Sequence, residues 1–120
     1  MNILDYVDTI KYIFYNVYRD YFMIYKIEKL KQAEKEIADL TKIQQKALKD
    51  DFKTIETKGL EFVKRRYLRD GLFEIKTNDV RALFKFQEER IILIGLVYEK
   101  RSNKAPDYYI NLAQKRLKEV

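Results

Sequence analysis

The spacing of the apolar residues changes near Gly59, and this change restricts the fold more than any other feature of the sequence. Before Gly59, apolar residues recur every three or four positions, which predicts amphipathic helices. After Gly59, apolar and polar residues alternate, which predicts strands with one buried face. Helices that cover a run of consecutive strands make an α+β domain.

Two predicted helices precede Gly59 and form a helical hairpin. Residues 30–40 place Ala33, Ile37 and Leu40 on one face. Thr41 is a residue type that caps helix starts, and Gly59 fits the position just past the end of the second helix. Residues 23–28, ahead of the hairpin, predict a first strand.

Three strands are predicted after Gly59, over residues 72–77, 80–87 and 91–98. The short turns between them, at residues 78–79 and 88–89, imply antiparallel neighbours. The last of these strands is almost continuously apolar, which is typical of a central strand. Pro106 and Asp107 then open a C-terminal helix, with Ile110, Ala113 and Leu117 facing inward. The expected fold is α+β: a small antiparallel sheet with a helical hairpin and a C-terminal helix.

Residues 1–22 are open to two interpretations. Six apolar side chains recur at alternating spacings of four and three, which favours an additional helix. Residues 10–18 are also rich in β-branched and aromatic types, which suits a strand. The helix is preferred because the apolar stripe runs the whole length, and we expect it to cover the sheet. The stripe consists of Ile3, Val7, Ile10, Phe14, Val17 and Tyr21. The predicted division is therefore a helical extension over 1–22 and a main domain over 23–120.

The charge of the chain favours a polyanionic partner, and most of it lies after residue 22. The formal net charge is +6, from 25 basic and 19 acidic residues. Residues 1–22 hold 2 of the basic and 3 of the acidic residues, so residues 23–120 carry 23 and 16, a net +7. RNA, DNA, an acidic membrane surface and an acidic protein all fit this balance.

The residue types that are missing limit the chemistry. The chain has no Cys and no His, which excludes disulfides, thiolate chemistry and the usual zinc sites. Acid–base chemistry must therefore use Lys, Tyr, Asp, Glu or Arg. The lack of Cys agrees with a reducing cytoplasm. No apolar run approaches the roughly 20 residues of a membrane span, and the N-terminus lacks the pattern of a signal peptide.

From residue 23 onward, four segments in order resemble the RelE/ParE superfamily of toxins, most closely its HigB-like, phage-derived branch. They are a strand and helix over 24–36, the run Leu-Arg-Asp-Gly-Leu-Phe-Glu-Ile-Lys over 68–76, a strand containing Arg81, and a basic segment over 98–106. The resemblance implies a small twisted RelE-like sheet. Two departures stand out. Many HigB-like members have a His where this chain has Leu96. The family usually begins at the first strand, whereas this chain has 22 residues before it.

The resemblance implies the toxin of a type II toxin–antitoxin system, an endoribonuclease that cleaves mRNA in the ribosomal A site. The RNA 2′-OH attacks the adjacent phosphorus, and a cyclic phosphate and a free 5′-OH result. This reaction needs a base, a cation beside the phosphate and an acid for the leaving oxygen, but no metal or other cofactor. The implied partners are a cognate antitoxin in a hetero-oligomer, the ribosome and mRNA, with no membrane.

Within that resemblance, four residues are the catalytic candidates. Arg81 suits the charge-stabilising role because a guanidinium can hold a phosphate through two hydrogen bonds. Tyr98 could stack on a base or donate a proton, and Lys76 or Lys100 could be the base. The candidate RNA-binding residues are Lys64, Arg65, Arg66, Arg69, Arg101 and Lys104.

Structural explanations exist for the same residues. Arg81 could pair with Glu74 on the surface of the hairpin, Tyr98 could be a core residue, and the basic cluster could be a solvated face.

Two other functions also fit the sequence. ParE-like relatives bind and poison DNA gyrase. A catalytically inactive nucleic-acid-binding or interaction module is compatible with Leu96 in place of the His.

Overall fold

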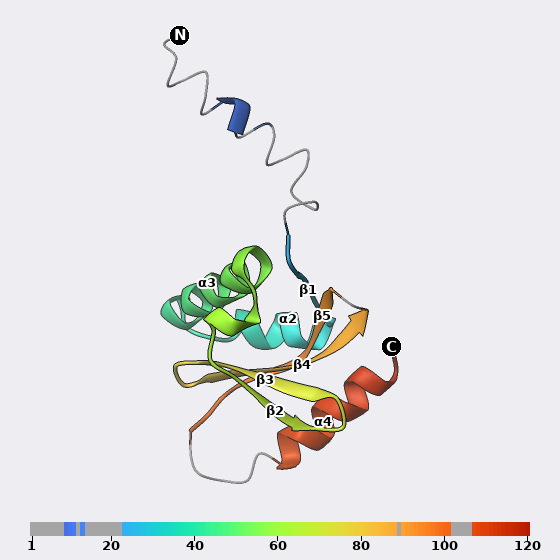
Figure 1. The fold of residues 1–120 in the computed structure, drawn as a ribbon. Coiled ribbons are helices and arrows are strands. Elements are labelled where there is room, and N and C mark those ends of the chain that lie inside the picture. Colours follow the sequence, from blue (N-terminus) through green and yellow to red (C-terminus); the bar gives the residue numbers. More distant parts are fainter. Residues whose placement is uncertain (1–8, 12, 14–22, 89, 102–106) are drawn as a thin grey trace.

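The fold is a five-stranded sheet with helices on both faces (Figure 1). The computed structural model describes residues 9–11, 13, 23–88, 90–101 and 107–120. The strands are β1 (Lys26–Lys29), β2 (Arg65–Arg69), β3 (Leu72–Thr77), β4 (Val80–Glu88) and β5 (Ile91–Glu99). The helices are α2 (Lys31–Ala38), α3 (Lys42–Lys58), the short 3₁₀ helix η1 (Leu60–Phe62) and α4 (Asp107–Lys118). The predicted α+β class is confirmed.

The strand order is β1-β5-β4-β3-β2, and it differs from the prediction in two ways. Strands β2 to β5 are antiparallel, but β1 pairs with β5 in parallel, Lys26 lying opposite Ile91. Such a parallel pair needs a long crossover, here the two helices and three strands between β1 and β5. Strand β2 was not predicted at all. Its signal is Asp70-Gly71, where both φ angles are positive (50° and 77°), as a two-residue hairpin turn requires.

Helix α3 begins and ends where the sequence predicts. The Thr41 hydroxyl accepts a hydrogen bond from the Gln44 backbone N–H, and the Gln44 side chain accepts one from the Thr41 N–H. At the other end, Gly59 has a φ of 119°, a conformation that glycine adopts without strain.

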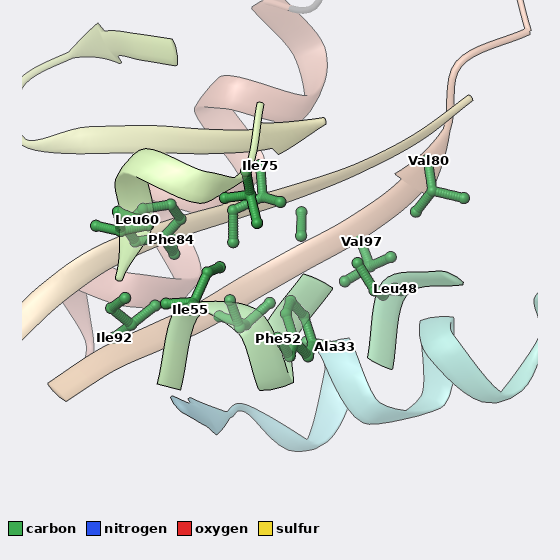
Figure 2. Packing of buried hydrophobic residues seen from close by; sticks show 13 residues of the cluster. Ala33, Leu48, Phe52, Ile55, Leu60, Ile75, Val80, Phe84, Ile92 and Val97 are labelled. Carbon is green, nitrogen blue, oxygen red and sulfur yellow. The ribbon is translucent and has the colours of Figure 1, made fainter. Parts of the chain in front are cut away.

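One face of the sheet packs against α2 and α3. Figure 2 shows Leu48, Phe52 and Ile55 of α3 gathered with Ala33 of α2 against side chains of the sheet. All four are at least nine-tenths buried. This core holds the helical hairpin on the sheet, as predicted from the apolar spacing.

The other face packs against α4. Leu83 and Leu96 from the sheet contact Ile110, Ala113 and Leu117 of the helix in a second buried cluster. The approach is close because Gly95 has no side chain: a Cβ there would lie 2.6 Å from Leu117 Cγ. The inward face predicted for the C-terminal helix is therefore confirmed.

A side-chain bridge covers the part of β5 that β1 leaves unpaired. Glu36 Oε1 accepts from the Val97 backbone N–H at 3.0 Å and from Arg116 Nη1 at 2.9 Å. Arg116 Nη1 also donates to the Gly95 carbonyl at 3.1 Å. Helices α2 and α4 are thus tied together across the free edge of β5, which satisfies backbone groups that would otherwise be exposed.

Several predictions fall mainly outside the described residues. Residues 9–11 and 13 are helical, and Ile10 and Ile13 are exposed, but the other members of the N-terminal apolar stripe are not described. The same applies to residue 89 of the predicted turn and to Pro106. The helical extension over 1–22, its packing on the sheet and its separation from residues 23–120 therefore stay predictions.

We expect Gly95→Ala to lower the free energy of unfolding by about 1–3 kcal/mol, because the added methyl overpacks the contact with Leu117. Denaturant unfolding measures the change. Leu117→Ala removes the opposing atoms, so Gly95→Ala should cost clearly less in that background. An equal cost in both backgrounds would show that the close approach of α4 does not explain the glycine.

Candidate functional site

Three of the four predicted catalytic residues form a row across the sheet. Lys76 of β3 pairs with Arg81 of β4, and Arg81 pairs with Tyr98 of β5. Directly opposite residues on neighbouring strands share a face. Leu83, two residues from Arg81, packs against α4, so the row lies on the α4 face.

The fourth predicted residue, Lys100, follows the end of β5. It is exposed, and its backbone N–H donates to the Asp79 carbonyl at 2.7 Å. Lys100 is two residues after Tyr98, and this bond links the end of β5 to the β3–β4 turn. Lys100 therefore lies at the end of the sheet where the row is found.

Arg81 is held in place by the β3–β4 turn. Its Nη1 donates to the carbonyls of Asn78 at 2.6 Å and Val80 at 3.1 Å. Its Nε lies 3.8 Å from Glu74 Oε1, and only 14% of the Arg81 side chain is exposed. The predicted pairing with Glu74 exists, but the prediction that it is a surface pair is wrong, because both side chains are largely buried.

Glu74 is the charged centre of this region and was not among the predicted site residues. It is 2% exposed. Arg66 Nη2 lies 3.4 Å from its Oε2, and the Arg66 side chain is about half exposed. Within the described ranges, Oε2 accepts no hydrogen bond. Glu74 thus lies between two guanidinium groups, one from each neighbouring strand.

Tyr98 is half-buried against α4. Its ring stacks on Tyr109 with centroids 3.8 Å apart and an interplanar angle of 5°, and Tyr108 meets Tyr109 edge-on at 5.3 Å. Burial raises the pKa of Tyr98 above its ordinary value of 10.0, and the Glu74 charge raises it further against the opposing effect of Arg81. The hydroxyl is therefore protonated at neutral pH.

Tyr109 was also missed by the sequence analysis. The available signal was the pair Tyr108-Tyr109 in the first turn of α4, directly after the basic segment. Aromatic rings beside basic residues are typical of surfaces that stack nucleic-acid bases. The structure places this pair next to Tyr98, which makes a short aromatic surface at the edge of the row.

The six predicted RNA-binding residues do not form one group. Arg66 joins the row through Glu74. Arg65 lies opposite Ile75, so it points to the α3 face, where its Nη1 donates to the Leu60 carbonyl at 3.0 Å. The other four are placed as follows: Lys64 is exposed just before β2, Arg69 donates to Asn111 of α4 at 2.7 Å, Arg101 is exposed and paired with Glu99 at 3.4 Å, and Lys104 is not described.

Neither a metal centre nor a membrane span is found in the described part of the chain. No three acidic side chains there come close enough together to hold a metal ion. No helix among those residues has the length and apolar character to cross a bilayer.

The comparisons with known proteins agree with this fold. The solved structures that match include three of RelE toxins or their complexes, each with a TM-score above 0.5. The archaeal RelE of a RelE–RelB complex from Pyrococcus horikoshii OT3 matches with a TM-score of 0.58 and 18% identity, over 69% of this chain and 100% of that one. The RelBE2 toxin–antitoxin complex from Mycobacterium tuberculosis gives 0.52 and 18%, over 62% and 96%. The isolated Escherichia coli RelE toxin gives 0.52 and 16%, over 72% and 96%.

The match to a family model is longer than any of these structural matches. Curated protein sequences gave no match. The family model described as "Phage derived protein Gp49-like (DUF891)" matches residues 26–118, which is most of the chain and includes every described strand and helix after residue 25. The chain therefore belongs to the Gp49-like family of phage-derived proteins and has the fold of the RelE superfamily.

Proposed function

We propose that this protein is the toxin of a type II toxin–antitoxin system and that it cleaves mRNA on the ribosome. The Gp49-like family and the RelE fold support the class of toxin. The observation that carries the proposed cleavage is the row on the α4 face, where a buried arginine lies beside a protonated tyrosine. The RNA 2′-OH would attack the adjacent phosphorus and release the 5′-oxygen.

Arg81 supplies the positive charge beside the phosphate. Two backbone carbonyls hold one end of its guanidinium. The hydrogen bonds and ion pair of Arg81 to described residues use Nη1 and Nε, and we assign Nη2 as the donor to a phosphate oxygen. A pre-oriented guanidinium stabilises the developing charge without reorganisation during the reaction.

Tyr98 acts as the acid. Its hydroxyl carries a proton at neutral pH, since burial raises its pKa above an ordinary value of 10.0, and it can donate this proton to the leaving 5′-oxygen. Its stack with Tyr109 fixes the ring, and the exposed ring of Tyr108 extends the surface available to a base. Lys76, in the same row, and Lys100, beyond Tyr98, are the proposed bases.

A cognate antitoxin is the proposed protein partner. Two of the similar structures are complexes of RelE toxins with RelB proteins or of a RelBE pair. We extend this to a hetero-oligomer for the present chain, with the ribosome and mRNA as its targets in the cytoplasm. Lys64, Arg65, Arg69, Arg101 and Lys104 are proposed as additional RNA contacts around Arg66.

A second candidate function is that of a catalytically inactive binding module. Leu96 occupies the position where many HigB-like relatives have a His, and it is 1% exposed in the core under α4. If cleavage needs an imidazole there, this chain lacks it. The gyrase-binding alternative gains no specific support from the described residues.

We expect mRNA 5′-ends mapped shortly after induction in bacteria to show new ends within translated codons. Arg81→Ala should remove them, because the phosphate loses its cation. Arg90→Ala is the matched control, since it removes an exposed arginine at the opposite end of β4. Growth arrest without new ends would favour a gyrase-type target. The absence of both growth arrest and new ends would favour the inactive module.

We expect Tyr98→Phe to slow cleavage roughly a hundredfold while leaving RNA affinity intact, because the ring stays and the proton donor is lost. Single-turnover cleavage of mRNA in stalled ribosome complexes measures the rate. Tyr98→Ala should weaken binding as well, since it also removes the ring that stacks on Tyr109. An unchanged rate in Tyr98→Phe would exclude the acid role.

A further inference from the structure

Glu74 is buried without the hydrogen bonds that normally accompany a buried carboxylate. Its side chain is 3% exposed, and no other buried side-chain polar atom within the described ranges lacks a hydrogen-bond partner as Oε2 does. Removing a carboxylate from water is costly unless opposite charge compensates for the lost hydration. The compensation here comes from the two neighbouring arginines.

The two arginines reach Glu74 from opposite sides. Arg66 belongs to β2 and pairs directly with Glu74, whereas Arg81 belongs to β4, one row further along. The separations are 3.4 Å from Arg66 Nη2 to Oε2 and 3.8 Å from Arg81 Nε to Oε1. Both exceed the usual length of an N–H···O hydrogen bond, so these contacts are ion pairs that leave guanidinium N–H groups available.

Glu74 sets the net charge of the three-residue cluster and keeps the two guanidinium groups close to each other. Without a carboxylate between them, Arg66 and Arg81 would repel each other, and the half-exposed Arg66 side chain would turn toward water. With Glu74 in place, the three side chains carry a net charge of +1. One phosphodiester carries a charge of −1, so the cluster is matched to a single phosphate.

We propose that Glu74 is a positioning residue that holds Arg66 and Arg81 together so that both guanidinium groups face one RNA phosphodiester. Glu74 itself does not touch the RNA. Its importance for cleavage rests on the proposed function, but the pairing of the two arginines is a property of the free protein and can be tested without any activity.

Tyr98 reports on the same carboxylate. The charge of Glu74 raises the pKa of this tyrosine, as do burial and Tyr109, while Arg81 and Arg66 lower it. Neutralising Glu74 removes one of the raising effects and leaves both lowering effects, so the pKa of Tyr98 should fall.

The experiment is NMR of the full-length free protein carrying Glu74→Gln. Two signals are followed: the Nε–Hε groups of Arg66 and Arg81, and the ring Cζ of Tyr98 during a pH titration. We expect both arginine signals to shift and the pKa of Tyr98 to fall. Glu28→Gln is the matched control, because it removes one carboxylate charge from a partly exposed position on β1 and should change neither readout. Unchanged arginine signals in folded Glu74→Gln would overturn the proposal.

A second variant tests the proposal if Glu74→Gln fails to fold. Arg66→Lys changes a half-exposed side chain, and if Glu74 joins the two arginines, it should shift the Arg81 Nε–Hε signal. An unaffected Arg81 signal would contradict the proposal.

A cleavage assay then separates this proposal from the proposed function. If the wild type cleaves RNA, Glu74→Gln should lower kcat by roughly tenfold with little change in KM. The variant site has one more net positive charge, which keeps RNA affinity, but its two guanidinium groups are no longer held in position beside the phosphate. A higher KM with unchanged kcat would contradict the positioning role. If the wild type cleaves no RNA, the proposed function fails, and the NMR result still decides the role of Glu74.

Discussion

The register of β3, β4 and β5 is the constraint on which the rest of the site depends. A slip of one residue would move every side chain of a strand to the opposite face. The β3–β4 turn fixes the register, with Asn78 at a φ of 54° and Thr77 paired with Val80. The bond from the Lys100 N–H to the Asp79 carbonyl fixes the end of β5 to that turn. Only in this register do Lys76, Arg81 and Tyr98 lie in one row beside a buried Glu74.

Helix α4 packs on the face of the sheet that carries this row. It reaches β5 closely because Gly95 leaves room for Leu117, and Arg116 ties it to Glu36 and to the β5 edge. This position brings Tyr109 onto Tyr98, on the face of the sheet where Glu74 is buried between Arg66 and Arg81. The packing of one helix therefore determines the surroundings of Tyr98, whereas Arg81 is placed by the β3–β4 turn.

Much of the fold could be predicted from local signals, whereas the buried charge could not. The cap at Thr41, the stop at Gly59 and the apolar run of β5 each depend on a few adjacent residues. The edge strand β2 was missed because its sequence, RRYLR, has no apolar alternation and most of its side chains are exposed. Glu74 was considered only as a surface partner of Arg81, and its burial depends on contacts that form in the folded sheet.

If RNA binds on the α4 face of the sheet, a titration with a short RNA will detect it there. A 2′-O-methyl trinucleotide lacks the attacking hydroxyl, so it can bind without being cleaved. Followed by NMR on the full-length protein, it should perturb the Arg66 and Arg81 guanidinium signals together with the rings of Tyr98 and Tyr109. Perturbations confined to the α3 face, around Arg65 and Tyr67, would contradict the account.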